Sequence, residues 1–138
     1  MAVPEGLRGT GKLEVFEKAL DLATYTITIT ANKKVFLPEY QGSLTDKING
    51  VALAIYMDAW TANNILVRNA EDFAERRHLQ EKAARNCNNL LALMQMAQKV
   101  FHLKLTRVKY WGEMTIGVRN LLRAWKESDY KRYSKLLA

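Results

Sequence analysis

Apolar residues recur every three or four positions along most of the chain, which is the spacing of one face of an α-helix. In the first such segment, from Leu13 to about Lys34, the stripe predicted to be buried comprises Leu13, Phe16, Leu20, Ala23 and Ile27. Residues 25–30 also alternate polar and apolar positions with β-branched side chains, as a strand does. We favour the helix, because Ile27 continues the helical stripe and no partner strand is visible elsewhere in the sequence.

The pattern predicts a second helix after a loop that is broken at Pro38. Ser43 and Asp46 have the spacing of an N-terminal capping box that opens this helix. Its predicted buried stripe comprises Leu44, Ile48, Val51, Ile55, Ala59, Ala62 and Leu66.

Two longer helices follow. Asn69 is predicted to cap the third, which has acids in its first turn and no break from Glu71 to about His102. Its inner face comprises Leu79, Ala83, Cys87, Leu90, Leu91, Met94, Ala97 and Phe101. Thr106 is predicted to cap the fourth, whose inner face comprises Trp111, Met114, Val118, Leu121, Leu122 and Trp125.

Four amphipathic helices with short connections predict an all-α protein, an antiparallel up-down-up-down four-helix bundle over residues 12–127. Residues 1–11 hold three of the seven Gly and one of the two Pro, so we expect a flexible leader there. Residues 128–138 are expected to form a short basic C-terminal tail that frays.

The net charge of +7 is concentrated in one part of the chain. Residues 1–98 hold 11 basic and 11 acidic side chains, whereas residues 99–138 hold ten basic side chains against three acidic ones. A local positive field attracts polyanions, of which nucleic acid is the commonest in a cell. A solvated helix face that serves solubility is the alternative.

The cellular location of the protein can be predicted from sequence patterns that are missing. No apolar run reaches the roughly 18 to 20 residues that a transmembrane helix needs, and the first residues have no secretory signal pattern. The single Cys87 is consistent with a reducing compartment. We expect a cytoplasmic protein without a membrane partner.

Residues for catalysis are few, so we expect no enzymatic activity, no metal and no cofactor. His78 and His102 lie 24 positions apart and lack the Glu-x-x-His pattern of di-iron bundles. Cys87 lies on an apolar stripe and is interpreted as a buried small hydrophobe rather than a nucleophile. Asp58, in an apolar stretch, either points into water or faces a buried cation, in one subunit or across an interface.

Basic and aromatic residues alternate near both ends of the fourth predicted helix, in residues 104–111 and 130–133. Cations neutralise phosphates, and Tyr or Trp rings stack on unpaired bases. Trp111 and Trp125 fit the core better, which leaves Tyr110, Tyr130 and Tyr133 as candidates for stacking.

Several segments together resemble a known family. They are the start of the first helix (Lys12–Leu20), the Phe36–Glu39 loop, the start of the second helix (Gly42–Ile48), the Leu-rich Asn89–Ala97, the Leu-Thr turn before a Tyr (Leu105–Tyr110) and Leu121–Trp125. Over residues 12–127 the chain resembles the accessory variability determinants of diversity-generating retroelements, which are related to proteins encoded in 23S rRNA intervening sequences.

This resemblance implies a homopentamer of bundles that forms a barrel with a positively charged surface. Such a protein binds the reverse transcriptase of the retroelement and its template RNA or cDNA, and supports mutagenic retrohoming without catalysing a reaction itself.

The leading hypothesis is therefore a non-enzymatic accessory protein that binds RNA or DNA. The residues predicted to contact phosphates are Lys104, Arg107, Lys109, Arg119, Arg123 and Lys126, with Arg76, Arg77 and Arg85 extending the patch. The alternative is a scaffold bundle of the intervening-sequence type with no role in nucleic-acid binding. A bundle enzyme with a metal or cofactor is a third, weaker possibility.

Overall fold

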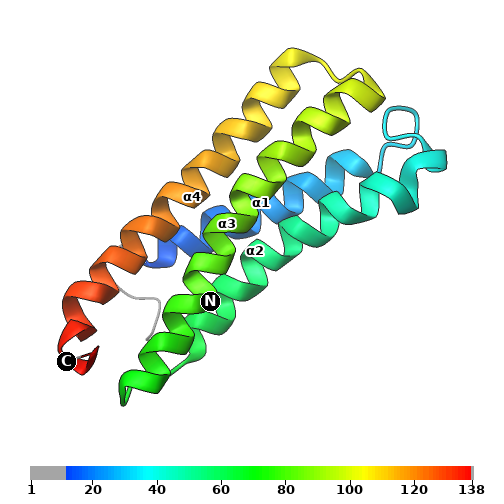
Figure 1. Cartoon of the computed structure of the whole chain (residues 1–138). Coiled ribbons are helices and arrows are strands. Elements are labelled where there is room, and N and C mark those ends of the chain that lie inside the picture. The colour runs from blue at the N-terminus through cyan, green and yellow to red at the C-terminus, as the bar shows by residue number, and fades with distance from the viewer. Residues whose placement is uncertain (1–11, 138) are drawn as a thin grey trace, which may run out of the picture.

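The computed structural model describes residues 12–137, nearly all of them helical (Figure 1). The long helices are α1 (Lys12–Thr30), α2 (Asp46–Asn64), α3 (Ala70–Phe101) and α4 (Leu105–Tyr133). Shorter turns are η2 (Pro38–Tyr40), η3 (Gln41–Thr45) and η4 (Ser134–Leu137). These residues include no strand, so the all-α prediction of four helices is confirmed. The expected leader, residues 1–11, lies outside the described part.

The four helices surround one core, because each packs against the next along the chain and α1 also packs against α4. The loop between α1 and α2 lies at the same end of the molecule as the turn between α3 and α4 (Figure 1). There the Phe101 ring lies 4.9 Å from that of Phe36 and 5.8 Å from that of Tyr40, between centroids. At the opposite end, Phe73 of α3 contacts Tyr133 of α4 at 5.6 Å.

The predicted inner faces of the second, third and fourth helices are largely confirmed. Trp111 is fully buried, and Trp125 packs edge-to-face on Phe16 of α1 at 5.5 Å. Half-buried residues of the predicted faces pack beside this core, namely Val51, Leu79, Leu91, Met114 and Leu121. The exception is Leu66, which lies beyond the end of α2 and is 73% exposed.

The predicted buried stripe of α1 was wrong at two positions, because Leu20 and Ile27 face outward. The buried face instead includes two threonines, Thr26 and Thr30, together with Val15, Phe16, Ala19, Leu22 and Ala23. The Thr26 hydroxyl donates to the Leu22 carbonyl at 2.8 Å, and that of Thr30 donates to the Thr26 carbonyl at 2.9 Å. Because carbonyl groups of the helix itself accept these hydrogen bonds, threonine can take the place of an apolar residue on the buried face. Residues 25–30 are part of helix α1 and do not form a strand.

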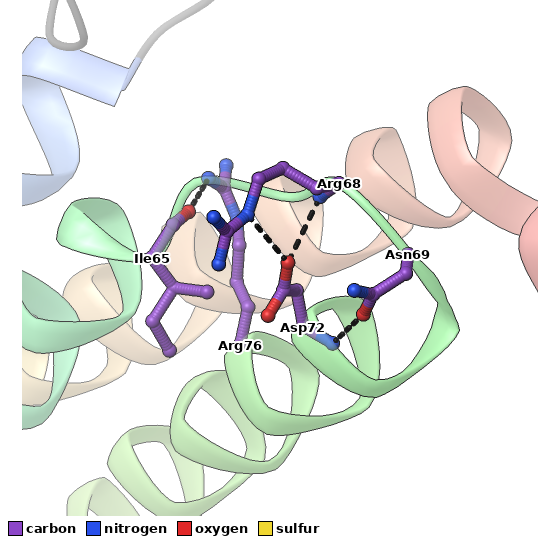
Figure 2. Close-up of polar contacts among 5 residues, drawn as sticks. All are labelled: Ile65, Arg68, Asn69, Asp72 and Arg76. Carbon is purple, nitrogen blue, oxygen red and sulfur yellow. Dashed lines mark hydrogen bonds and ion pairs between the residues drawn. The ribbon is translucent and has the colours of Figure 1, made fainter.

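Of the three predicted caps, one is confirmed. The Asn69 side chain accepts a hydrogen bond from the Asp72 backbone N–H at 2.9 Å and so caps α3 (Figure 2). The capping box at Ser43 was wrong, because Ser43 lies within the π-helical turn η3 and α2 has no side-chain cap. The cap at Thr106 was also wrong, since α4 already begins at Leu105.

The segment expected to fray after residue 127 is ordered as helix. Helix α4 continues to Tyr133, and η4 follows it to Leu137. The cause is burial, because Asp129 is only 2% exposed and faces α3. The end of α4 is therefore part of the bundle.

The buried bond between α1 and α4 provides a test of this core. Trp111 Nε1 donates to Thr26 Oγ1 at 2.9 Å. Thr26→Val leaves this indole N–H without a partner, so we expect the free energy of unfolding to fall by about 1–3 kcal/mol. Thr24→Val, at an exposed position of the same helix, is the control and is expected to change it by less than about 0.5 kcal/mol. Urea denaturation measures both, and equal losses would contradict this account of the α1 core.

Candidate nucleic-acid interface

Five basic side chains line the junction of α3 and α4. Three of them, Arg119, Arg123 and Lys126, lie on one stripe of α4 because their spacings of four and three residues match the helical period. The other two, Arg77 and Arg85, lie on α3. We call these five residues the α3–α4 basic face.

A shallow groove of about 230 Å³ lies within the α3–α4 basic face. Its lining comprises Gln80, Glu81, Ala84, Arg85 and Asn88 from α3 and Leu122, Arg123 and Lys126 from α4. Three of these eight side chains are cationic and one is anionic, so the groove is a positively charged depression whose floor includes Leu122, which is fully buried.

Contacts across the junction fix several of these cations. Arg119 donates to Asn88 Oδ1 at 2.8 Å, and Lys126 donates to Glu81. The Arg77 guanidinium carbon lies 5.0 Å from the ring centroid of Tyr130, a cation–π contact on the exposed surface. Neighbours on the opposite helix therefore hold Lys126 at the groove and hold Arg77 and Arg119 elsewhere on the α3–α4 basic face.

The electrostatics of Glu81 show how positive this surface is. The hydrogen bond from Lys126 lowers the pKa of Glu81 below its ordinary value of 4.5, and the charges of Lys126, Arg77 and Arg85 act in the same direction. Slight burial acts against them without reversing the direction. The Glu81 carboxylate is therefore ionised at neutral pH and surrounded by cations from both helices.

The other basic residues near the start of α4 that were predicted to contact phosphates, Lys104, Arg107 and Lys109, lie away from the α3–α4 basic face. Arg107 lies on the side of α1, where it donates to the Tyr25 hydroxyl at 3.5 Å and lines a cavity with Thr28 and Asn32. Lys104 precedes α4 and Lys109 lies in its first turns, both exposed. At 1.5 Å per residue, ten residues of helix place Lys109 about 15 Å along the axis from Arg119.

Arg76 is a correction to the predicted patch, because it is 5% exposed and paired inside the bundle. Its Nε and second terminal nitrogen donate to the two oxygens of Asp129 at 2.7 and 3.1 Å, a bidentate ion pair. Gln80 donates to the same carboxylate at 2.7 Å. The remaining terminal nitrogen reaches the Ile65 carbonyl at 3.5 Å (Figure 2). Arg76 is thus fully engaged and unavailable to a phosphate.

Asp129 is the important residue that the sequence interpretation missed. Its signal was the helical period, since Leu122, Trp125 and Asp129 succeed one another on one buried stripe of α4. Because Asp129 is charged and lies in a basic segment, it was predicted to belong to the solvated C-terminal tail instead.

Asp58 and the aromatic candidates also have defined places. Asp58 of α2 is partly buried, with its carboxylate 3.9 Å from Lys82 Nζ on α3, so it faces a cation within the same chain. Tyr110 and Tyr130 are exposed, which keeps them available for stacking, whereas Tyr133 is half-buried against Phe73.

Cys87 and the acidic and histidine side chains are chemical groups that catalysis or metal binding can use. Cys87 is fully buried, as predicted, and burial raises the pKa of its thiol to about 12 although Arg119 and Arg123 act against this. Over residues 12–137, no three His, Cys, Asp or Glu side chains are grouped so as to hold a metal ion. In the same part of the chain no helix is long and apolar enough to cross a membrane.

Comparison with models of protein families, with curated proteins and with solved structures finds no match to this chain.

The buried ion pair leads to a stability prediction. Arg76→Met leaves the Asp129 carboxylate buried without its countercharge, so we expect unfolding to become easier by about 3–5 kcal/mol. Arg68→Met, which removes the 71% exposed partner of Asp72 near the start of α3, is the matched control and is expected to cost no more than about 1 kcal/mol (Figure 2). Thermal and urea unfolding compare the two, and similar losses would contradict a structural role for the pair.

Cys87 gives a chemical test of the packing between α3 and α4. With its pKa raised to about 12, the thiol is protonated at pH 8, and it is also shielded from reagents. We expect Ellman's reagent to label the native protein at least about a hundred times more slowly than the urea-unfolded protein, where the pKa returns to about 8.5. Equal labelling rates would mean that Cys87 is accessible in the native state.

Proposed function

We propose that this protein is a non-enzymatic accessory protein that binds RNA or DNA through the α3–α4 basic face. The observation that supports this most is the gathering of cations from two helices. Arg85, Arg123 and Lys126 line one groove that holds a single carboxylate, and Arg77 and Arg119 lie on the same basic face. Phosphate contacts of this kind release counterions and give affinity without base specificity. Tyr130, beside Arg77 on the same face, is an aromatic surface on which an unpaired base can stack.

The partner in this proposal is the reverse transcriptase of a diversity-generating retroelement. It rests on the resemblance of residues 12–127 to the accessory variability determinants, and the basic face is the feature that such a role requires. The protein would act in the cytoplasm, holding template RNA or cDNA near the enzyme during mutagenic retrohoming. A reverse-transcriptase gene and a pair of template and variable repeats beside this gene are expected; their absence would argue against this partner.

Self-assembly is the second part of the proposal. In it, the chain is an antiparallel up-down-up-down bundle that forms a homopentameric barrel. Four large apolar side chains on α1 and α2 are 42–52% exposed and support an association surface: Leu20, Ile27, Leu53 and Met57. Leu20 and Ile27 lie seven residues apart, and Leu53 and Met57 four apart, so each pair shares one face of its helix.

The same exposed residues favour the alternative function, a scaffold bundle that makes protein contacts and binds no nucleic acid. Under that alternative the basic residues of α3 and α4 serve solubility or protein contacts. A direct measurement of binding to RNA and to single-stranded DNA distinguishes the two functions.

Charge reversal on the basic face tests the proposed function. We expect Arg85→Glu/Arg123→Glu to weaken binding to an RNA of about 20 nucleotides on the order of 50-fold at about 0.1 M salt, because two phosphate contacts are lost. The slope of log affinity against log salt is expected to fall by about two. Fluorescence anisotropy at several salt concentrations measures both quantities.

The matched control for this experiment is Lys34→Glu/Lys47→Glu, which makes the same change in net charge at exposed positions outside the α3–α4 basic face. If the control loses as much affinity as the variant of the basic face, the effect comes from net charge and the assigned surface is wrong. If the parent protein binds neither RNA nor DNA, the scaffold function replaces this proposal.

A further inference from the structure

The groove of the α3–α4 basic face already holds an anionic group of the protein itself. Glu81 is the one acid among the eight lining residues, and it accepts a hydrogen bond from Lys126. The positive charges of Arg77 and Arg85 also stabilise its ionised carboxylate. A carboxylate and a phosphate present similar oxygen acceptors to lysine and arginine, so this arrangement has the chemistry of an occupied anion site.

We propose that this groove is a subsite for one phosphate group of the bound nucleic acid, and that Glu81 occupies it in the free protein. Binding then exchanges the Glu81 carboxylate for a phosphate as the acceptor of Lys126. The inference rests on the proposed function. In it, Glu81 lowers the affinity of the protein for nucleic acid instead of contributing to it.

The exposure of the pair makes the exchange physically accessible. The Lys126 side chain is 27% exposed and that of Glu81 is 44% exposed. Both therefore reach solvent, and rotation about their side-chain bonds separates them without a backbone movement. Arg123 and Arg85 line the same groove and remain in place to contact the incoming phosphate.

The consequence is a fixed penalty on every binding event. The free protein must first give up the contact between Lys126 and Glu81, and the displaced carboxylate stays close enough to repel the strand. A ligand that fills only this subsite gains little, whereas a longer strand that also contacts Arg77 and Arg119 overcomes the penalty. Glu81 thereby favours extended strands over single phosphate groups.

Removing the charge of Glu81 tests this inference. We expect Glu81→Gln to bind the RNA more tightly, by about fivefold to eightfold at most at about 0.1 M salt. One phosphate contact changes the slope of log affinity against log salt by about 0.7 for a single strand and about 0.9 for a duplex, and log salt is about −1 at this concentration. Glu75→Gln is the matched control, since it removes the same charge from an exposed position on the same helix. A gain in affinity for Glu81→Gln that clearly exceeds the control supports the subsite, and equal gains overturn it.

A double-mutant cycle adds an independent readout. If binding must break the contact between Lys126 and Glu81, Lys126→Gln loses more affinity in the Glu81→Gln background than in the parent. Equal losses in the two backgrounds would overturn the exchange. Circular dichroism confirms that each variant is folded before its affinity is compared.

Failure of this inference is distinguishable from failure of the proposed function. A parent protein that binds RNA, with a Glu81→Gln variant no tighter than the control, overturns the subsite and leaves the nucleic-acid function standing. A parent that binds neither RNA nor single-stranded DNA overturns both.

Discussion

The buried ion pair between Arg76 and Asp129 fixes the last turns of α4 against the first turns of α3. In a low-dielectric interior each charge is tolerated because the other neutralises it in bidentate geometry, so the two helices are held in one register. The basic face depends on that register. Lys126 and Tyr130 lie three residues before and one residue after Asp129, and their contacts with α3 form only when this end of α4 stays docked.

Most of the fold could be predicted from the sequence, because the number of helices and the inner faces of α2, α3 and α4 follow from the spacing of apolar residues. Two of the failures, in the buried stripe of α1 and at the C-terminal end of α4, have one cause. The interpretation treated polarity as exposure, whereas Thr26 is buried with its hydroxyl satisfied by its own helix, and Asp129 is buried with its charge satisfied by Arg76. A partner that is distant in sequence, or a backbone carbonyl, makes a polar residue behave as a core residue, and spacing alone does not identify that partner.

The residues of the candidate site were predicted only in part, because the sequence does not show which side of a helix faces which neighbour. The sequence located the excess charge near the C-terminus, but a helix distributes its residues over all sides. Arg76 and Arg77 are adjacent in sequence and about 100° apart around α3, so one is buried against Asp129 and the other stacks on Tyr130 at the surface. Arg107 and Arg119 share α4 but face different neighbours. The arrangement of the four helices around one another decides which basic residues share a surface.

The α3–α4 basic face and the four exposed apolar residues of α1 and α2 that support association lie on different helix pairs, and this separation bears on the proposed assembly. If subunits associate through the exposed apolar residues of α1 and α2, the basic residues of α3 and α4 stay free in every subunit. A ring then presents several copies of the basic face, and a strand bound to one copy meets the next at a high effective concentration. Under these conditions Glu81, as proposed, weakens each single contact, so a short strand that engages one copy binds weakly, whereas a long strand is retained by the combined affinity of the several copies that it engages at once.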